Sequence, residues 1–171
     1  FGGGYPASSV NRIEYVTIAT PSDATDVGDL TVARKDVAAC SDGTKGLFGG
    51  GSLGPYYGTK INAIEYVTIA SLGNATDFGD LTVARRRLAA CSDGTKGLWG
   101  GGDHQWIFNC IDYVTIATTG NATDFGDLTR TTAAYTAGCS DGTKGVFGGG
   151  NTSSGVNLTN TIDYVTIATT G

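Results

Sequence analysis

The sequence is poor in the residues that build most catalytic and metal centres. It contains no methionine, one histidine and no CxxC pair among its four cysteines. The only histidine, His104, falls in a predicted loop, so this chain cannot assemble a histidine-based catalytic triad or a multi-histidine copper or zinc centre. Most arginines sit at equivalent positions of a repeat, which indicates a structural role. We therefore predict a protein that is not an enzyme and that binds no metal and no cofactor.

Long apolar segments and clustered positive charge are also missing. No apolar run approaches the roughly 20 residues that span a bilayer, so we expect no membrane insertion. The chain holds 11 Lys and Arg against 16 Asp and Glu, a net charge of -5, and its one basic cluster is Arg85-Arg86-Arg87. Nucleic acids and anionic membranes require a larger basic surface. We expect neither of them as a partner.

The four cysteines follow a repeat rather than a disulfide or zinc pattern. Cys40, Cys91 and Cys139 occupy one repeated position, and Cys110 lies outside it. Equivalent positions in successive units are set well apart, which argues against disulfides between them. We predict that the cysteines are small, buried side chains of the core.

Glycine, in contrast, is abundant and regularly placed. Many of its 28 copies stand in triplets. The phrase CSDGTKGLFGGG at 40–51 recurs almost unchanged at 91–102 and 139–150, and IEYVTIA or IDYVTIA begins at 13, 64, 111 and 162. Residues 13–51 and 64–102 are identical at about 30 of 39 positions, which indicates duplication.

Each unit contains four strand-like segments separated by turn residues, and none of them has a helical period. In the first copies these segments are Val32 to Cys40, Lys45 to Gly49, Ile13 to Ala19 and Asp26 to Leu30. The Asp-Gly pair after the first segment favours a tight hairpin turn. Four antiparallel strands in a period near 50 residues are typical of a β-propeller blade. The predicted fold class is therefore all-β, a β-propeller built from four-stranded antiparallel blades.

The glycine triplets have a physical role in this prediction. Glycine at the end of an inner strand lets neighbouring backbones approach closely and permits the positive-φ turns that follow. Phe48, Trp99 and Phe147 precede the triplets and are predicted to fill the space between the faces of adjacent units. The phrase recurs because each unit must bury its face on the next.

The residues of one unit resemble the Kelch motif over essentially the whole chain. A glycine triplet, Gly49 to Gly51, closes the second strand, and an acidic-aromatic pair, Glu65-Tyr66, lies in the third. Phe78 supplies the aromatic residue of the fourth strand, where Kelch repeats carry tryptophan, and Arg85 follows it. The resemblance implies Kelch-like blades whose loops gather on one face.

The repeats divide the chain into one repeat domain, 1–171, of about three and a half units. The units are 1–30 (partial), 31–81, 82–128 and 129–171 (partial). The last unit carries one extra residue, and its arginine shifts to Arg130. A propeller takes 4 to 8 blades, and the two partial units do not complete one another. We expect a segment of a longer polypeptide, with an oligomerising fragment or an open stack of units as alternatives.

An Asn-Ala-Thr-Asp-Phe-Gly-Asp phrase at 74–80, with counterparts at 23–29 and 121–127, has two interpretations. Its oxygen-bearing side chains could cradle calcium. The favoured interpretation is that Asn, Asp and Gly cap and turn the outermost strand.

The repeats diverge mainly in the loop between the second and third strands. These loops cover 5–12, 52–63, 103–110 and 151–161. By resemblance to Kelch propellers, they form the binding face, and exposed aromatic residues with Asn, Asp and Ser nearby suit carbohydrate or protein recognition. The candidate ligand-binding residues are Tyr5, Tyr56, Tyr57, His104, Trp106 and Phe108. Alternatively, the loops vary because nothing constrains them.

The near-identical units also resemble the repetitive Kelch-like proteins of bacteriophages, especially marine ones, which are thought to be virion- or tail-associated. This resemblance implies a non-catalytic structural or recognition protein on a virion or other extracellular surface. Its partners would be other copies, other particle proteins, a surface glycan or a host protein. The alternative is a cellular, cytoplasmic Kelch-type scaffold for protein-protein interaction.

Overall fold

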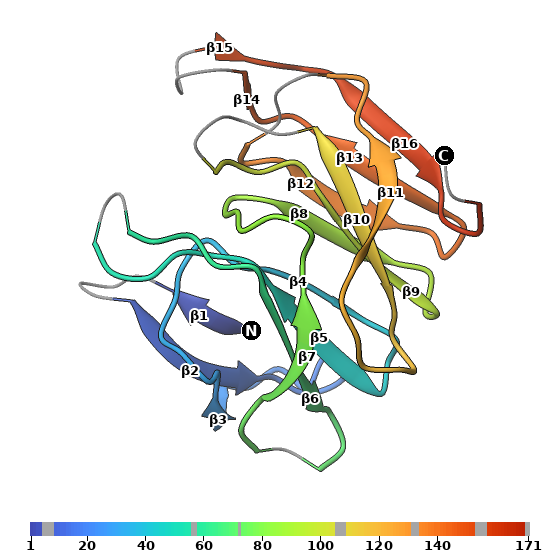
Figure 1. The fold of residues 1–171 in the computed structure, drawn as a ribbon. Coiled ribbons are helices and arrows are strands. Elements are labelled where there is room, and N and C mark those ends of the chain that lie inside the picture. The colour runs from blue at the N-terminus through green and yellow to red at the C-terminus, as the bar shows by residue number, and fades with distance from the viewer. Residues whose placement is uncertain are drawn as a thin grey trace.

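A computed structural model describes residues 1–4, 9–55, 58–71, 73–104, 109–130, 134–152 and 157–169. Within these ranges the regular elements are all strands, so the described chain has no helix that could cross a membrane. The strands form four antiparallel sheets of three or four strands and one two-stranded ribbon (Figure 1). The predicted all-β class is confirmed.

Two of the sheets have four strands each, arranged in chain order. Sheet 2 consists of β4 (Ala38–Ser41), β5 (Lys45–Gly49), β6 (Ala63–Thr68) and β7 (Thr76–Asp80). Sheet 3 consists of β8 (Ala89–Ser92), β9 (Lys96–Gly100), β10 (Cys110–Thr115) and β11 (Thr123–Asp127). The same local sequence thus forms the same meander twice.

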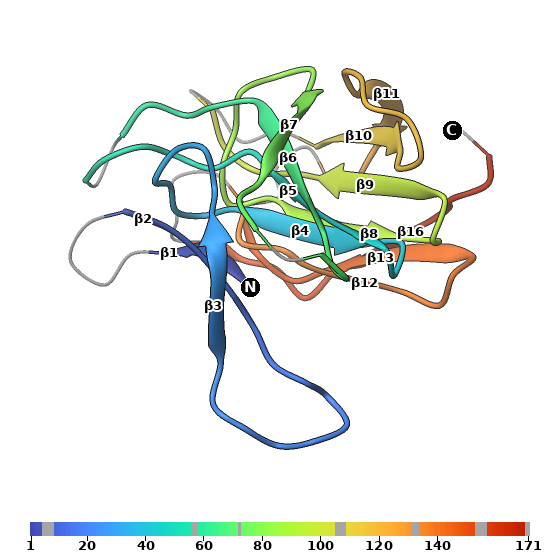
Figure 2. The same cartoon turned by 90° about the horizontal axis from the view of Figure 1, so that it is seen from below.

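The outer two sheets have three described strands each. Sheet 1 contains β1 (Gly2–Gly4), β2 (Val10–Tyr15) and β3 (Thr25–Asp29), which correspond to the second, third and fourth strands of a unit. Sheet 4 contains β12 (Ala137–Ser140), β13 (Lys144–Gly148) and β16 (Ile162–Thr166), the first three strands. A ribbon of β14 (Asn151–Thr152) and β15 (Asn157–Leu158) lies between β13 and β16 in sequence. Strands β4, β8 and β12, the inner strands, lie side by side (Figure 2).

The predicted hairpin between the first and second strands is confirmed. Ala38 pairs with Gly49 and Ser41 with Gly46 across β4 and β5. In the turn, Asp42 Oδ1 accepts hydrogen bonds from the N–H groups of Thr44 at 2.7 Å and Lys45 at 2.6 Å. Burial opposes ionisation of this carboxyl, but these hydrogen bonds outweigh it and lower the pKa of Asp42.

The predicted boundaries of the strands need correction. The second strand, Lys45–Gly49, is confirmed, but the first is Ala38–Ser41 rather than Val32 to Cys40. Residues before Ala38 leave the sheet because Asp36 adopts a left-handed conformation, with φ of 59°. The third strand is Val10–Tyr15 rather than Ile13 to Ala19, and the fourth starts one residue earlier, at Thr25.

Aromatic side chains fill the space between neighbouring sheets, as predicted. The Trp99 ring lies 2.5 Å from the position that a Cβ atom would take on Gly49, and Phe147 lies 2.7 Å from that position on Gly100. Trp99 is fully buried, and its Nε1 donates a hydrogen bond of 3.2 Å to the carbonyl of Ala38. Any side chain on these glycines would therefore collide with the ring of the next sheet.

Ion pairs with buried acids tie sheets 2, 3 and 4 to the segments that precede them. The pairs are Arg34–Glu65 at 3.4 Å, Arg85–Asp112 at 2.8 Å and Arg130–Asp163 at 3.4 Å. A threonine from the same segment donates its hydroxyl to the same carboxylate in each case. The shifted arginine of the last unit thus still reaches the equivalent acid.

The environment of one repeated isoleucine shows how the sheets cover each other. The fully buried copies are Ile116 and Ile167, with an exposed fraction of 0%. Ile69 is 44% exposed and Ile18 is 96% exposed, although all four follow the same Val-Thr pair. The loop that carries Ile18, between β2 and β3, extends away from the other sheets (Figure 2). Burial is therefore set by the neighbouring sheet and not by local sequence.

Candidate functional site

Most of the predicted ligand-binding residues fall outside the described residues. These are Tyr5, Tyr56, Tyr57, Trp106 and Phe108. His104 is described and is partly buried. The aromatic loop face therefore stays a prediction.

The described ends of the variable loops show where these loops leave the sheets. Isolated β-bridges join Lys35 to Ser52, Arg86 to Asp103, and Ala134 to Asn151. The second partner of each bridge directly follows a glycine triplet and begins a variable loop, whereas the first lies just before an inner strand. Because the inner strands lie side by side, these three loops start from the same edge of the molecule.

Three non-glycine residues with left-handed backbone mark this edge. Asp36, Arg87 and Tyr135 occupy equivalent positions and have φ angles of 59°, 60° and 59°. Their backbones form a continuous series, since Arg87 N–H donates to Asp36 O at 3.1 Å and Tyr135 N–H donates to Arg87 O at 2.9 Å. A left-handed conformation costs a residue with a Cβ atom about 1–2 kcal/mol. The chain thus keeps three different side chains where glycine would be less strained.

Charged groups surround the middle residue of this series. Arg86 lies 3.3 Å from Asp103 and 3.8 Å from Asp36, measured between nitrogen and carboxylate oxygen. Arg87 lies 3.5 Å from Asp103 and 3.8 Å from Asp36. Two cations and two anions therefore balance. We call Asp36, Arg86, Arg87, Asp103 and Tyr135 the rim cluster.

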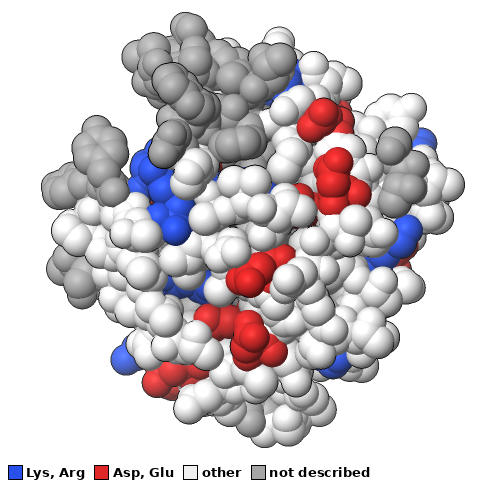
Figure 3. Space-filling view, viewed as in Figure 1, with Lys and Arg blue, Asp and Glu red and all other residues white. Residues whose placement is uncertain are grey.

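An aromatic ring completes the rim cluster. The Arg87 guanidinium carbon lies 4.4 Å from the centroid of the Tyr135 ring, a cation-π distance. Tyr135 is 53% exposed. On the face shown in Figure 3, acidic and basic side chains lie next to each other in several places, and most of the surface carries neither. The rim cluster thus offers paired charges and an exposed aromatic side chain, which suits recognition of a polar ligand.

The described copies of the acidic phrase at 74–80 make two kinds of contact. Local ones, such as the Gly126 N–H bond to Asp124 Oδ1 at 3.2 Å, fit the capping interpretation, whereas the asparagines join neighbouring sheets. Asn74 Oδ1 accepts a hydrogen bond of 3.0 Å from the N–H of Asp29, on the neighbouring outer strand. Asn121 Oδ1 accepts the equivalent bond from Asp80. In the described part of the chain, no group of three or more His, Cys, Asp or Glu side chains is placed to hold a metal ion.

Only one of the four cysteines is fully buried, so the prediction that all of them are buried core side chains is wrong. All four are free thiols; Cys91 is buried, Cys40 and Cys110 are partly buried, and Cys139 is exposed. Burial, with smaller contributions from Cys139 and Asp93, raises the pKa of Cys91 to about 12. Cys139 differs because no described sheet covers the face of sheet 4 on which it lies.

The rim cluster was not predicted from the sequence, because all of its residues except Asp103 lie beside the inner strands and not in the loops that differ most between units. The pairs Lys35-Asp36, Arg86-Arg87 and Ala134-Tyr135 differ between units, whereas the Ala-x-Cys-Ser-Asp-Gly-Thr-Lys-Gly phrase that begins two residues later is nearly constant. Variation just before a nearly constant phrase is therefore the feature of the sequence that indicates this site.

Comparison with known proteins does not place this chain in a family. Neither a scan against protein-family models nor a search of curated proteins finds a match to this chain.

Proposed function

We propose that this chain is a run of β-propeller blades that acts as a non-catalytic recognition module. The single observation that carries the proposal is the strained rim position occupied by Asp36, Arg87 and Tyr135. Strained backbone persists at binding sites because the side chain is needed there. The 28 glycines show that the sequence uses glycine freely at other left-handed positions.

The propeller interpretation is supported by the relation between the sheets. Each four-stranded meander buries one face on the next sheet, and the inner strands adjoin one another. Repetition of this relation is how a blade array is built. A Kelch-like array with further blades agrees with the residues that carry the resemblance.

The proposed ligand is a carbohydrate or a protein surface bound at the rim cluster and the adjacent variable loops. A neutral set of ion pairs beside an exposed Tyr135 suits a ligand with hydroxyl or amide groups, whereas a strongly charged ligand would find no net opposite charge. Tyr5, Tyr56, Tyr57, His104, Trp106 and Phe108 would extend this surface.

We further propose that the module belongs to the exposed surface of a viral particle, in the tail or another appendage. Support comes from the resemblance of its units to repetitive phage proteins. A cellular Kelch-type scaffold is the alternative, which would bring additional domains instead of many symmetry-related copies. The intact mass of the native polypeptide and images of its assembly separate these two contexts.

The binding proposal is tested with Tyr135→Gly and Arg87→Gly on an array of bacterial surface glycans. Glycine fits the left-handed backbone, so each variant removes a side chain and should keep the fold. We expect binding by the unmodified chain and at least a tenfold loss in either variant. Tyr164→Ala, which removes an exposed tyrosine from sheet 4, serves as the matched control and should bind normally.

Two results would overturn carbohydrate recognition at the rim cluster. One is an array on which the unmodified chain binds no glycan. The other is equal binding by the two glycine variants and the Tyr164→Ala control. Circular dichroism of each variant shows whether the fold is kept, so that loss of binding is not confused with unfolding.

A further inference from the structure

A groove of about 950 Å³ lies between sheet 1 and sheet 2. Sheet 1 lines it with residues that include Phe1, Tyr15 and Ile18, and sheet 2 with residues that include Gly46, Val67 and Ile69. Most of these are apolar. Large exposed apolar surfaces often mark interaction sites. The neighbouring sheets indicate what would bind in this groove.

The groove lies where the other sheets place their inner strand. In sheets 2, 3 and 4 the inner strand pairs with the strand that follows it in the hairpin. In sheet 1 the corresponding second strand is β1, and no described strand pairs with its other edge. An unpaired edge beside an apolar groove is a site for addition of a β-strand.

The equivalent space between sheets 2 and 3 is filled. There Cys40 Sγ lies 2.7 Å from the Cβ position of Gly97, and between sheets 3 and 4 Cys91 Sγ lies 2.7 Å from that of Gly145. At Gly46 the nearest atoms are Val67 Cγ2 at 3.6 Å and Ile69 Cγ1 at 4.0 Å, both from sheet 2 itself. The groove thus has room beside Gly46 for a cysteine side chain.

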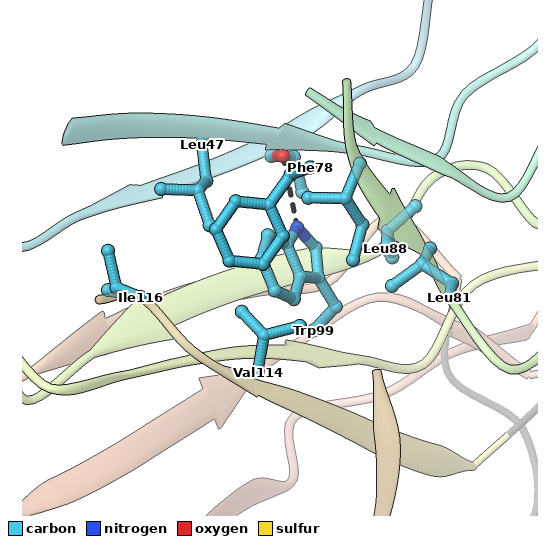
Figure 4. Packing of buried hydrophobic residues seen from close by; sticks show 9 residues of the cluster. Leu47, Phe78, Leu81, Leu88, Trp99, Val114 and Ile116 are labelled. Atoms are coloured by element: carbon cyan, nitrogen blue, oxygen red, sulfur yellow. Dashed lines mark hydrogen bonds between the residues drawn. The ribbon is translucent and has the colours of Figure 1, made fainter. Parts of the chain in front are cut away.

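Figure 4 shows the filled counterpart, a buried cluster that includes Leu47, Trp99 and Ile116. The lysine of the hairpin closes this space, because Lys45 Nζ donates to the carbonyl of Ile116 at 3.1 Å. Lys96 Nζ makes the same bond to Ile167 at 3.0 Å. In the groove the corresponding isoleucine is Ile69, which is 44% exposed.

Strand β2 also ends early beside the groove. In sheets 2 and 3 the third strand continues to Thr68 and Thr115, where it pairs with the hairpin lysine. The equivalent residue next to sheet 1 is Thr17, which lies two residues beyond the end of β2 at Tyr15. No described strand pairs with the backbone from Val16 to Ile18, whereas in the filled sheet the equivalent Ile69 N–H donates to Thr44 O at 2.8 Å.

We infer that the groove binds a β-hairpin with the sequence Ala-Ala-Cys-Ser-Asp-Gly-Thr-Lys-Gly-Leu, supplied by a further copy of the repeat. This sequence is common to 38–47 and 89–98, the two hairpins that occupy the equivalent space elsewhere. Its first strand would pair with β1, its cysteine would lie against Gly46, and its Lys-Gly-Leu would pair with residues 15–17. The inference concerns an interface between units and does not depend on the rim cluster or its ligand.

The first experiment titrates the chain with a synthetic peptide of residues 88–98. We expect saturable one-to-one binding and slower amide hydrogen exchange at Val16 and Ile18, because their equivalents Val67 and Ile69 stand at the hydrogen-bonded positions of the filled sheet. Gly46→Leu should weaken binding at least tenfold, because its side chain points into the groove and occupies the place of the peptide cysteine. Ser22→Leu adds the same side chain to an exposed loop outside the groove and should leave the affinity unchanged.

A second experiment tests the position of the peptide by mixed-disulfide formation. A sulfur 2.7 Å from a Cβ position is close to the roughly 3 Å that follows from disulfide bond lengths. The chain with Gly46→Cys should therefore capture the peptide through its cysteine in glutathione buffer, with the link mapped by mass spectrometry. The chain with Ser22→Cys should capture it at least tenfold less.

Three results would overturn the inference. The first is a titration without saturable binding. The second is equal affinity of the chain and its Gly46→Leu variant, with normal circular dichroism of that variant. The third is equal capture at positions 46 and 22, which would show that the peptide has no fixed place.

Discussion

The repeated isoleucine gives a stability test in which local sequence is held nearly constant. Ile18, Ile69, Ile116 and Ile167 each follow Val-Thr and precede Ala, yet their exposed fractions are 96%, 44%, 0% and 0%. Replacing each one by alanine removes the same atoms from four environments. Differences in the free energy of unfolding then report the packing of neighbouring sheets.

The expected magnitudes follow from burial. An Ile→Ala change removes about three methylene equivalents, worth roughly 2.4 kcal/mol when fully buried, and the cavity left behind raises the loss to about 3–4 kcal/mol. Ile116→Ala and Ile167→Ala should show this full loss. Ile69→Ala should lose about 1–1.5 kcal/mol because its side chain is half exposed, and Ile18→Ala should change stability by less than about 0.5 kcal/mol.

Urea denaturation followed by far-ultraviolet circular dichroism measures these differences, with equal slopes across the series as the condition for comparing midpoints. The expected order of destabilisation is Ile116 and Ile167, then Ile69, then Ile18. Equal losses at Ile18 and Ile116 would refute the reasoning. That result would mean that the isoleucine stabilises its own strand and not the contact between sheets.

Three further predictions concern other parts of the framework. Gly50→Ala should lower the free energy of unfolding by about 3 kcal/mol or more in urea denaturation, because Gly50 has φ of 68° and a Cβ would lie 2.6 Å from a backbone oxygen. Gly43→Ala should lower it by only about 1–2 kcal/mol, because the space around Gly43 is open. Equal losses would contradict this reasoning. Asp112→Asn should lower stability by about 3–5 kcal/mol because its arginine partner is left buried without a counter-ion, and a loss below 1 kcal/mol would argue against the pair. At pH 8, Cys139 should react with iodoacetamide much faster than Cys91, because Cys139 is exposed whereas Cys91 is buried and its pKa of about 12 leaves little of it as thiolate. Equal rates would contradict this and would show that sheet 3 opens readily.

The sequence predicts the fold where periodicity and turn chemistry agree. The segment Lys45–Gly49 and its hairpin were predicted correctly because the period of the repeat, the Asp-Gly pair and the glycine triplet all indicate the same boundaries. The segment from Val32 was wrongly included in a strand. Its small and apolar residues fit a strand, but the left-handed Asp36 turns the chain toward the rim, and a non-glycine residue gives no local sign of that conformation.

The candidate site was harder to predict for a related reason. Loop divergence points to a face but does not show which framework side chains reach it. Arg87 and Tyr135 meet only because successive inner strands adjoin, a relation between units that no single repeat contains. Arg130 gives the opposite case. The alignment of the repeats does not place it opposite the equivalent acid, yet in the folded chain it lies 3.4 Å from Asp163.

The near-identity of the contacts between sheets has a consequence for how such genes change. The boundary between sheets 2 and 3 and the boundary between sheets 3 and 4 both use an aromatic ring against glycine, a buried acid paired with an arginine, and a lysine that closes the hairpin. Unequal recombination between near-identical coding segments would insert or delete one unit of 47 or 51 residues and rejoin boundaries that already fit. The number of units can therefore vary between lineages without new compensating substitutions, while each inserted unit brings its own loop for selection to diversify.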